Sequence, residues 1–67
     1  MTYEELDSLC RLTRENDYPL SGRNEDGESI IIRRGPDRYE VTTAQNNGWL
    51  QVVTYWKDGT VEEEYTK

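Results

Sequence analysis

The clearest structural signal in the chain lies between Trp49 and Thr66, which read WLQVVTYWKDGTVEEEYT. Two runs rich in β-branched and aromatic residues flank Asp58-Gly59, a dipeptide typical of a two-residue type I′ hairpin turn. We therefore predict a hairpin of residues 49–56 and 61–66, with Trp56 opposite Val61. Because side chains alternate along a strand, this register predicts two faces. The face expected to meet a helix carries Leu50, Val52, Trp56, Val61 and Tyr65, and the other carries Trp49, Gln51, Val53, Tyr55, Glu62 and Glu64.

Three further strands are predicted upstream of this hairpin. The β-branched run Ile30-Ile31-Ile32 indicates a central strand within residues 28–34. Residues 38–43 alternate between apolar and polar side chains and indicate another strand. Residues 18–23 contain a proline and a glycine, which is typical of a short edge strand. The intervening segments, residues 24–27, 35–37 and 44–48, are rich in turn-forming residues.

The N-terminal segment predicts one helix. A capping box begins at Thr2, and apolar side chains then recur at helical spacing. We expect the helix to extend from Tyr3 to Glu15, with Asn16 suited to its C-terminal cap. The predicted fold class is α+β, with one N-terminal helix packed on a four- or five-stranded antiparallel sheet. Residues 1–67 are expected to form a single domain.

The composition indicates an acidic protein, expected in the cytoplasm. Its 67 residues include 14 acidic and 8 basic side chains, which gives a net charge of −6. This charge disfavours direct binding to nucleic acid or to an anionic membrane, and it favours a basic protein partner. Cys10 is the sole cysteine, so no internal disulfide is expected. No apolar run approaches the roughly 20 residues of a membrane span, and the first residues do not match a signal peptide.

The sequence lacks the residue patterns that catalysis requires. It contains no histidine, the commonest general base and neutral metal ligand. Cys10 lies on the apolar side of the predicted helix and is interpreted as a core thiol. The acidic segment of residues 24–27 is interpreted as a turn, because it does not follow the ligand spacing of a calcium loop. We therefore predict a protein that is not an enzyme and that uses no cofactor or metal.

The densest acidic run, Glu62-Glu63-Glu64, permits two interpretations. Like charges on an edge strand protect a sheet against edge-to-edge aggregation. Alternatively, Glu62 and Glu64 project from one face at a spacing of about 6–7 Å, close to the separation of phosphates along one nucleic-acid strand. On the predicted register Trp49 and Tyr55 share this face, and aromatic side chains of this kind anchor protein interfaces.

The first two-thirds of the chain contains an ordered series of short motifs. A capped helix precedes Asp17-Tyr18, Leu20-Ser21-Gly22, an acidic turn, Ile31-Ile32-Arg33, a Gly/Asp turn and Tyr39-Glu40-Val41-Thr42. Over residues 4–43 this order resembles a family of small acidic anti-CRISPR proteins that inhibit type II-A Cas9. The resemblance implies a helix followed by a three-stranded antiparallel sheet. It also implies that carboxylates around the turn between the second and third strands occupy the arginine-rich site that reads the PAM, a role that would fall to Asp37 and Glu40. The predicted C-terminal hairpin departs from the family, whose members continue into helices.

The preferred functional hypothesis is a phage-type, non-enzymatic inhibitor that covers a basic DNA-reading surface, with a CRISPR effector nuclease as a candidate target. The turn of residues 35–40 is the expected inhibitory element, because the acidic turn and the resemblance coincide there. One alternative is a small protein-interaction or regulatory domain without DNA mimicry, and another is a structural subunit of a mobile-element particle. The oligomeric state is left open. The predicted partner-binding residues are Asp37, Glu40, Trp49, Tyr55, Glu62 and Glu64.

Overall fold

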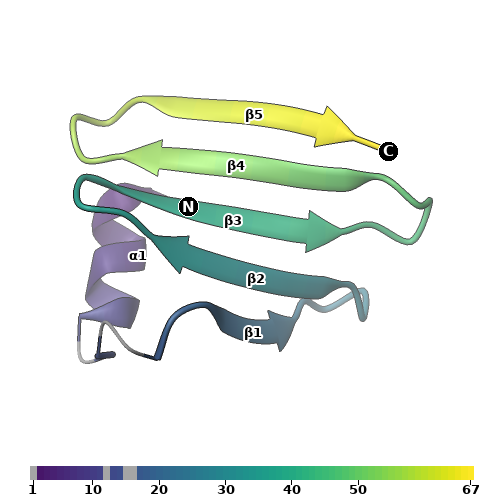
Figure 1. The fold of residues 1–67 in the computed structure, drawn as a ribbon, viewed down its shortest axis with the longest axis horizontal. Helices are drawn as coiled ribbons and strands as arrows, with labels where there is room; N and C mark the ends of the chain where they lie inside the picture. Colours follow the sequence, from purple (N-terminus) through teal and green to yellow (C-terminus); the bar gives the residue numbers. More distant parts are fainter. Residues whose placement is uncertain (1, 12, 15–16) are drawn as a thin grey trace.

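The chain folds into one helix packed on one antiparallel sheet, which confirms the predicted α+β class (Figure 1). The computed structural model describes residues 2–11, 13, 14 and 17–67. The sheet has five strands in the order β1-β2-β3-β4-β5, so each strand pairs with its neighbour in sequence. The elements are α1 (Tyr3–Cys10), β1 (Leu20–Arg23), β2 (Ser29–Arg34), β3 (Arg38–Ala44), β4 (Leu50–Trp56) and β5 (Val61–Thr66).

The helix begins where the capping box predicts and ends earlier than expected. The Thr2 side chain accepts a hydrogen bond from the backbone N of Glu5 at 3.2 Å. The last helical residue is Cys10, whose carbonyl oxygen accepts from Thr13 N at 2.9 Å and from the Tyr18 hydroxyl at 3.3 Å. These bonds satisfy the terminal carbonyl without another helical turn, so the predicted extension to residue 15 is wrong. The predicted cap at residue 16 lies outside the described residues.

The core is formed where α1 packs on the end of the sheet that carries the β2–β3 turn. Its fully or almost fully buried members are Leu6, Cys10 and Tyr39. Partly buried residues of α1, of four strands and of the segment before β1 surround them, namely Tyr3, Tyr18, Leu20, Ile32, Val41 and Tyr55. Because α1 has only eight residues, it covers part of one sheet face and leaves the opposite face bare. In Figure 1 the sheet is viewed with α1 behind it.

Three of the four hairpins close with the same loop geometry. In each, the N–H of a glycine bonds the carbonyl three residues earlier, with N···O distances of 3.0–3.1 Å at Gly27, Gly48 and Gly59. All three glycines have positive φ, between 79° and 96°. Among the described residues no non-glycine residue has a positive φ, so each loop is a type I turn followed by a left-handed glycine.

This geometry overturns the predicted hairpin turn between β4 and β5. A type I′ turn requires positive φ at Asp58 as well as at Gly59, and only Gly59 has it. The loop therefore contains three residues, closed by a bond from Trp56 N to Thr60 O at 2.8 Å. Tyr55, rather than Trp56, lies opposite Val61. A shift of one residue moves every side chain of one strand to the other face relative to its neighbour.

The predicted faces of the hairpin are consequently wrong. On β4, Val53 and Tyr55 point toward α1, because they lie opposite the core residues Val41 and Tyr39 of β3. The other set on β4, which includes Trp56, points away from α1. On β5 the observed register places Val61, Glu63 and Tyr65 on the helix side, and Glu62, Glu64 and Thr66 on the opposite side.

Candidate functional site

The bare side of the sheet is the candidate functional surface. We call it the open face, and define it as the strand side chains that point away from α1. Two cross-strand rows cross its centre. The first row is Arg33, Glu40, Thr54 and Glu62, and the second is Ser21, Ile31, Thr42, Val52 and Glu64. The open face thus carries a basic side chain on β2 (Arg33), apolar side chains on β2 and β4 (Ile31 and Val52), and acidic side chains on β5 (Glu62 and Glu64).

Three of the six predicted binding residues share the open face. Glu62 and Glu64 are exposed on β5, an edge strand whose six residues are all exposed. Glu40 is half-buried on β3, and its carboxylate accepts a hydrogen bond from Arg38 Nε at 3.1 Å. The guanidinium of Arg38 also lies 5.2 Å from the ring of Trp56. The charge of Glu40 is therefore partly offset within the chain, whereas Glu62 and Glu64 form no ion pair with any residue that the structure describes.

Asp37 lies in the turn between β2 and β3, where its side chain is 58% exposed. Its carboxylate is 3.8 Å from Arg38 Nη1, and its backbone carbonyl accepts a hydrogen bond from Lys57 N at 2.8 Å. The turn is thus fixed against the β4–β5 loop, and its charge is partly offset by Arg38. Between the two acidic surfaces predicted from the sequence, the β5 carboxylates carry the less compensated charge.

The two predicted aromatic anchors are separated from these carboxylates. Tyr55 points toward α1 and packs against the core. Burial raises the pKa of its hydroxyl, and the negative charges of Glu63 and Glu5 raise it further. Trp49 precedes β4 and borders a shallow recess with Tyr65, a residue of the helix side. The ammonium of Lys67 lies 5.4 Å from the Trp49 ring. Neither aromatic residue therefore lies on the same face as Glu62 and Glu64, so neither can anchor a partner beside these carboxylates.

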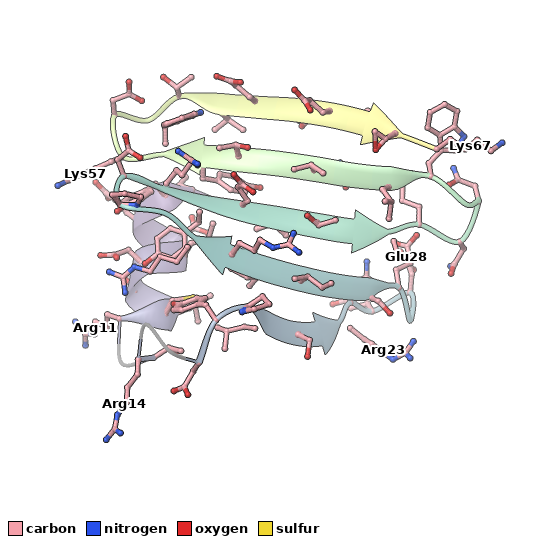
Figure 2. All side chains as sticks on the ribbon, viewed as in Figure 1. Arg11, Arg14, Arg23, Glu28, Lys57 and Lys67 are labelled. Carbon is pink, nitrogen blue, oxygen red and sulfur yellow. The ribbon has the colours of Figure 1, made fainter. Side chains whose placement is uncertain are left out.

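Sequence reasoning missed a polar junction built by Glu28 at the end of the sheet. One carboxylate oxygen accepts from Asn24 Nδ2 and the other accepts from the backbone N of Asn46, both at 2.9 Å. These bonds tie the β1–β2 loop to the β3–β4 loop, and Figure 2 shows Glu28 at this end of the sheet. Hydrogen bonds from Asn24, and then from Asn46, lower the pKa of Glu28. The i,i+4 spacing of Asn24 and Glu28 offered a partial signal, but the contact with Asn46 depends on the tertiary fold.

Replacing Glu28 should show how much this junction contributes to thermal stability, because that contribution depends on pH. The folded-state pKa of Glu28 is lowered, so its stabilisation is present above the unfolded pKa and is lost as pH falls through the folded value. Glu28→Gln should therefore lower the thermal midpoint near neutral pH and converge with the parent in acid. Glu25→Gln, in the same loop, is the matched control and should leave the midpoint unchanged. Parallel melting curves for the parent and Glu28→Gln across this pH range would contradict the assignment.

Few groups of the described chain are arranged for chemistry. Cys10, the last residue of α1, is only 3% exposed. Among residues 2–11, 13, 14 and 17–67, no three acidic, cysteine or histidine side chains gather to hold a metal ion. A surface recess of about 330 Å³ is lined by Tyr18, Arg34, Gly35 and Pro36, which include no carboxylate or thiol. Within the same described residues, no helix is long and apolar enough to cross a membrane.

Comparison of the chain with protein-family models, with curated proteins and with solved structures finds no match.

Proposed function

We propose that this protein is a non-enzymatic inhibitor whose open-face carboxylates occupy the basic, DNA-reading surface of a nucleic-acid-binding protein. The observation that carries this proposal is the position of Glu62 and Glu64. Both are exposed, both lie on one face of an edge strand, and neither is paired with a described basic residue. A net charge of −6 adds long-range attraction to a basic partner.

The spacing of these carboxylates suits a surface that binds phosphates. Residues two apart on a strand are separated by about 6–7 Å, close to the distance between successive phosphates of one nucleic-acid strand. Arginine forks that bind phosphate also bind carboxylate in bidentate fashion. The edge position leaves the carboxylates accessible to a groove, because no further strand flanks β5 in the sheet.

A Cas9-like effector nuclease is the candidate target that the resemblance implies. That resemblance assigned contact to Asp37 and Glu40, whereas their contacts with Arg38 favour β5 as the main inhibitory element. On this proposal Asp37 extends the acidic surface at one end. Arg38 orients the carboxylate of Glu40 and reduces the contribution of Glu40 to the electrostatic attraction for a basic partner.

Charge reversal separates the two acidic surfaces. Glu62→Lys with Glu64→Lys should weaken binding to a type II-A Cas9–guide complex at least about tenfold, because each contact carboxylate becomes a like charge facing a basic site. Asp37→Lys with Glu40→Lys should weaken it less. The matched control is Glu4→Lys with Glu25→Lys, which makes the same change in net charge on exposed residues of α1 and the β1–β2 loop.

The measurement is competition between each variant and PAM-containing DNA for the same nuclease, at low and at raised salt. The parent should displace the DNA, and its association should slow as salt rises, because screening removes the long-range attraction. If both double variants compete with DNA as well as the parent does, the mimicry proposal is wrong.

One observation favours a different function, that of a protein-interaction domain without DNA mimicry. Exposed apolar side chains lie on the helix side of the molecule, where Leu9 is 73% exposed, Tyr65 53% and Val61 50%. An apolar surface of this kind binds partners with little dependence on salt. Binding of a partner that survives all of the charge reversals above would favour this function.

A further inference from the structure

No helix or strand of the described residues covers the open face. α1 occupies the opposite side of the sheet (Figure 1). Ile31 and Val52 remain half-exposed on the open face, and Leu50 is 42% exposed. An antiparallel sheet can leave one face in water, and apolar side chains that remain on such a face are stabilised when a partner covers them. The open face therefore offers a surface that a second molecule can cover.

One row of side chains on the open face carries charges that complement those of a second copy. In the row Arg33–Glu40–Thr54–Glu62, the basic end lies on β2 and an acidic end lies on β5. Consider a two-fold axis that runs parallel to the strands, between β3 and β4. It would place β2 of one copy against β5 of the second copy, and β3 against β4. Arg33 of one copy would then meet Glu62 of the second copy, and the pair would occur twice. Neither residue forms an ion pair with a described residue of its own chain.

From this pattern we infer that the protein forms a homodimer by face-to-face packing of two open faces. The same axis sets Val52 over Thr42 of the second copy and Leu50 over Ala44, so that larger side chains meet smaller ones. It also sets Glu64 over Ile31, so Glu64 gains no basic partner in the dimer. About this axis the strands β2–β5 of one copy overlap the same four strands of the second copy, and β1 lies outside the overlap.

The remaining surfaces are less suited to self-association. Edge-to-edge pairing of two β5 strands would bring their Glu62-Glu63-Glu64 runs together, and like charges at a strand edge oppose such pairing. The other edge, β1, has only four residues. On the helix side, α1 projects from the sheet and prevents a second sheet from packing flat against this face. A pair formed through the open faces uses the same surface on both copies, so it closes at two chains.

The dimer does not depend on which protein the inhibitor targets, although the dimer contact includes Glu62 and Glu64, the residues proposed to bind that target. Face-to-face packing would cover Glu62 and Glu64. A dimer and a complex with a basic partner would therefore exclude each other, and the partner would bind the dissociated chain. Arg33 would stabilise the dimer without contributing attraction to a basic partner.

The test is the mass of the purified protein in solution without any partner, measured by sedimentation equilibrium over a range of concentrations. The parent should approach roughly 16 kDa, twice the 7.9 kDa of one chain. Arg33→Glu should raise the dimer dissociation constant about tenfold or more, because the reversal places a like charge against Glu62 at two symmetric points. The double variant Arg33→Glu with Glu62→Arg should restore dimerisation to within about threefold of the parent.

Neighbouring residues that point to the helix side provide the controls. Arg34→Glu and Glu63→Arg make the same charge changes on the same two strands and should leave the dissociation constant within about threefold. Thermal unfolding of each variant verifies that it is folded. A mass of one chain at every concentration would overturn the inference, as would a dimer that Arg33→Glu does not weaken. A chain that stays monomeric would still present Glu62 and Glu64 to a basic partner, so the two proposals fail separately.

Discussion

Replacing Tyr39 by alanine should leave the protein largely unfolded at 25 °C. Tyr39 is fully buried beneath α1, its ring centroid is 5.2 Å from that of Tyr3, and its hydroxyl donates to Asp7 Oδ1 at 2.8 Å. Removing a large buried aromatic side chain costs about 3–5 kcal/mol. A domain of this length has a total free energy of unfolding of only about 3–10 kcal/mol. Circular dichroism and urea denaturation should therefore show loss of most of the cooperative transition.

Tyr39→Phe separates packing from hydrogen bonding. It retains the ring and removes the bond to Asp7, and it should cost about 1.5–3 kcal/mol, the range for a hydrogen bond to a charged group. Burial, and then the hydrogen bond to Asp7, raise the pKa of Tyr39 well above its usual value. Its hydroxyl should therefore resist titration in the folded parent. Val61→Ala, at a half-exposed position of β5, serves as the control. A stability of Tyr39→Ala close to that of the parent would show that α1 does not pack on β3 as described.

Gly59→Val should destabilise the β4–β5 hairpin by about 1–3 kcal/mol. Gly59 has a φ of +96°, a conformation that a β-branched residue adopts only with strain. No atom lies within 4 Å of a Cβ built at this position, so the cost arises from the backbone rather than from a clash. Chemical denaturation would measure it.

Gly22→Ala is the matched control for this loop. Gly22 lies in β1 with ordinary φ, and a Cβ there also meets no atom within 4 Å. The alanine should be neutral or slightly stabilising, because it reduces the entropy of the unfolded chain. If Gly59→Val and Gly22→Ala had equal effects, the left-handed loop geometry of Gly59 would be contradicted.

The strands could be predicted because their signals are local. The β-branched run of residues 30–32 does form an interior strand, residues 20–23 do form an edge, and β5 spans the predicted residues 61–66. Each depends on alternation, side-chain shape or turn-forming residues within a few positions. The start of α1 was predictable for the same reason, since its cap lies within four residues of sequence.

The hairpin register and the candidate site were not predictable to the same degree. Asp58-Gly59 is compatible with a two-residue type I′ turn and with the three-residue loop that forms, and the two differ by one residue of register. That residue decides whether Glu62 and Glu64 share a face with Tyr55 or with Glu40. The repeated Asp/Asn-Gly at positions 26–27, 47–48 and 58–59 was the available signal, because three equivalent loops share one geometry.

The consecutive strand order has a consequence for how the chain folds. Each strand adds to the strand made just before it, so every hairpin closes a short loop at a small entropic cost. Topologies of low contact order fold quickly for their size. α1 must find a partner farther along the chain than the paired strands do, since Asp7 and Tyr39 are 32 residues apart. The docking of α1, rather than the assembly of the sheet, is then the step that bears the cost of a long loop. As the chain leaves the ribosome, the first four strands can pair before the acidic fifth emerges.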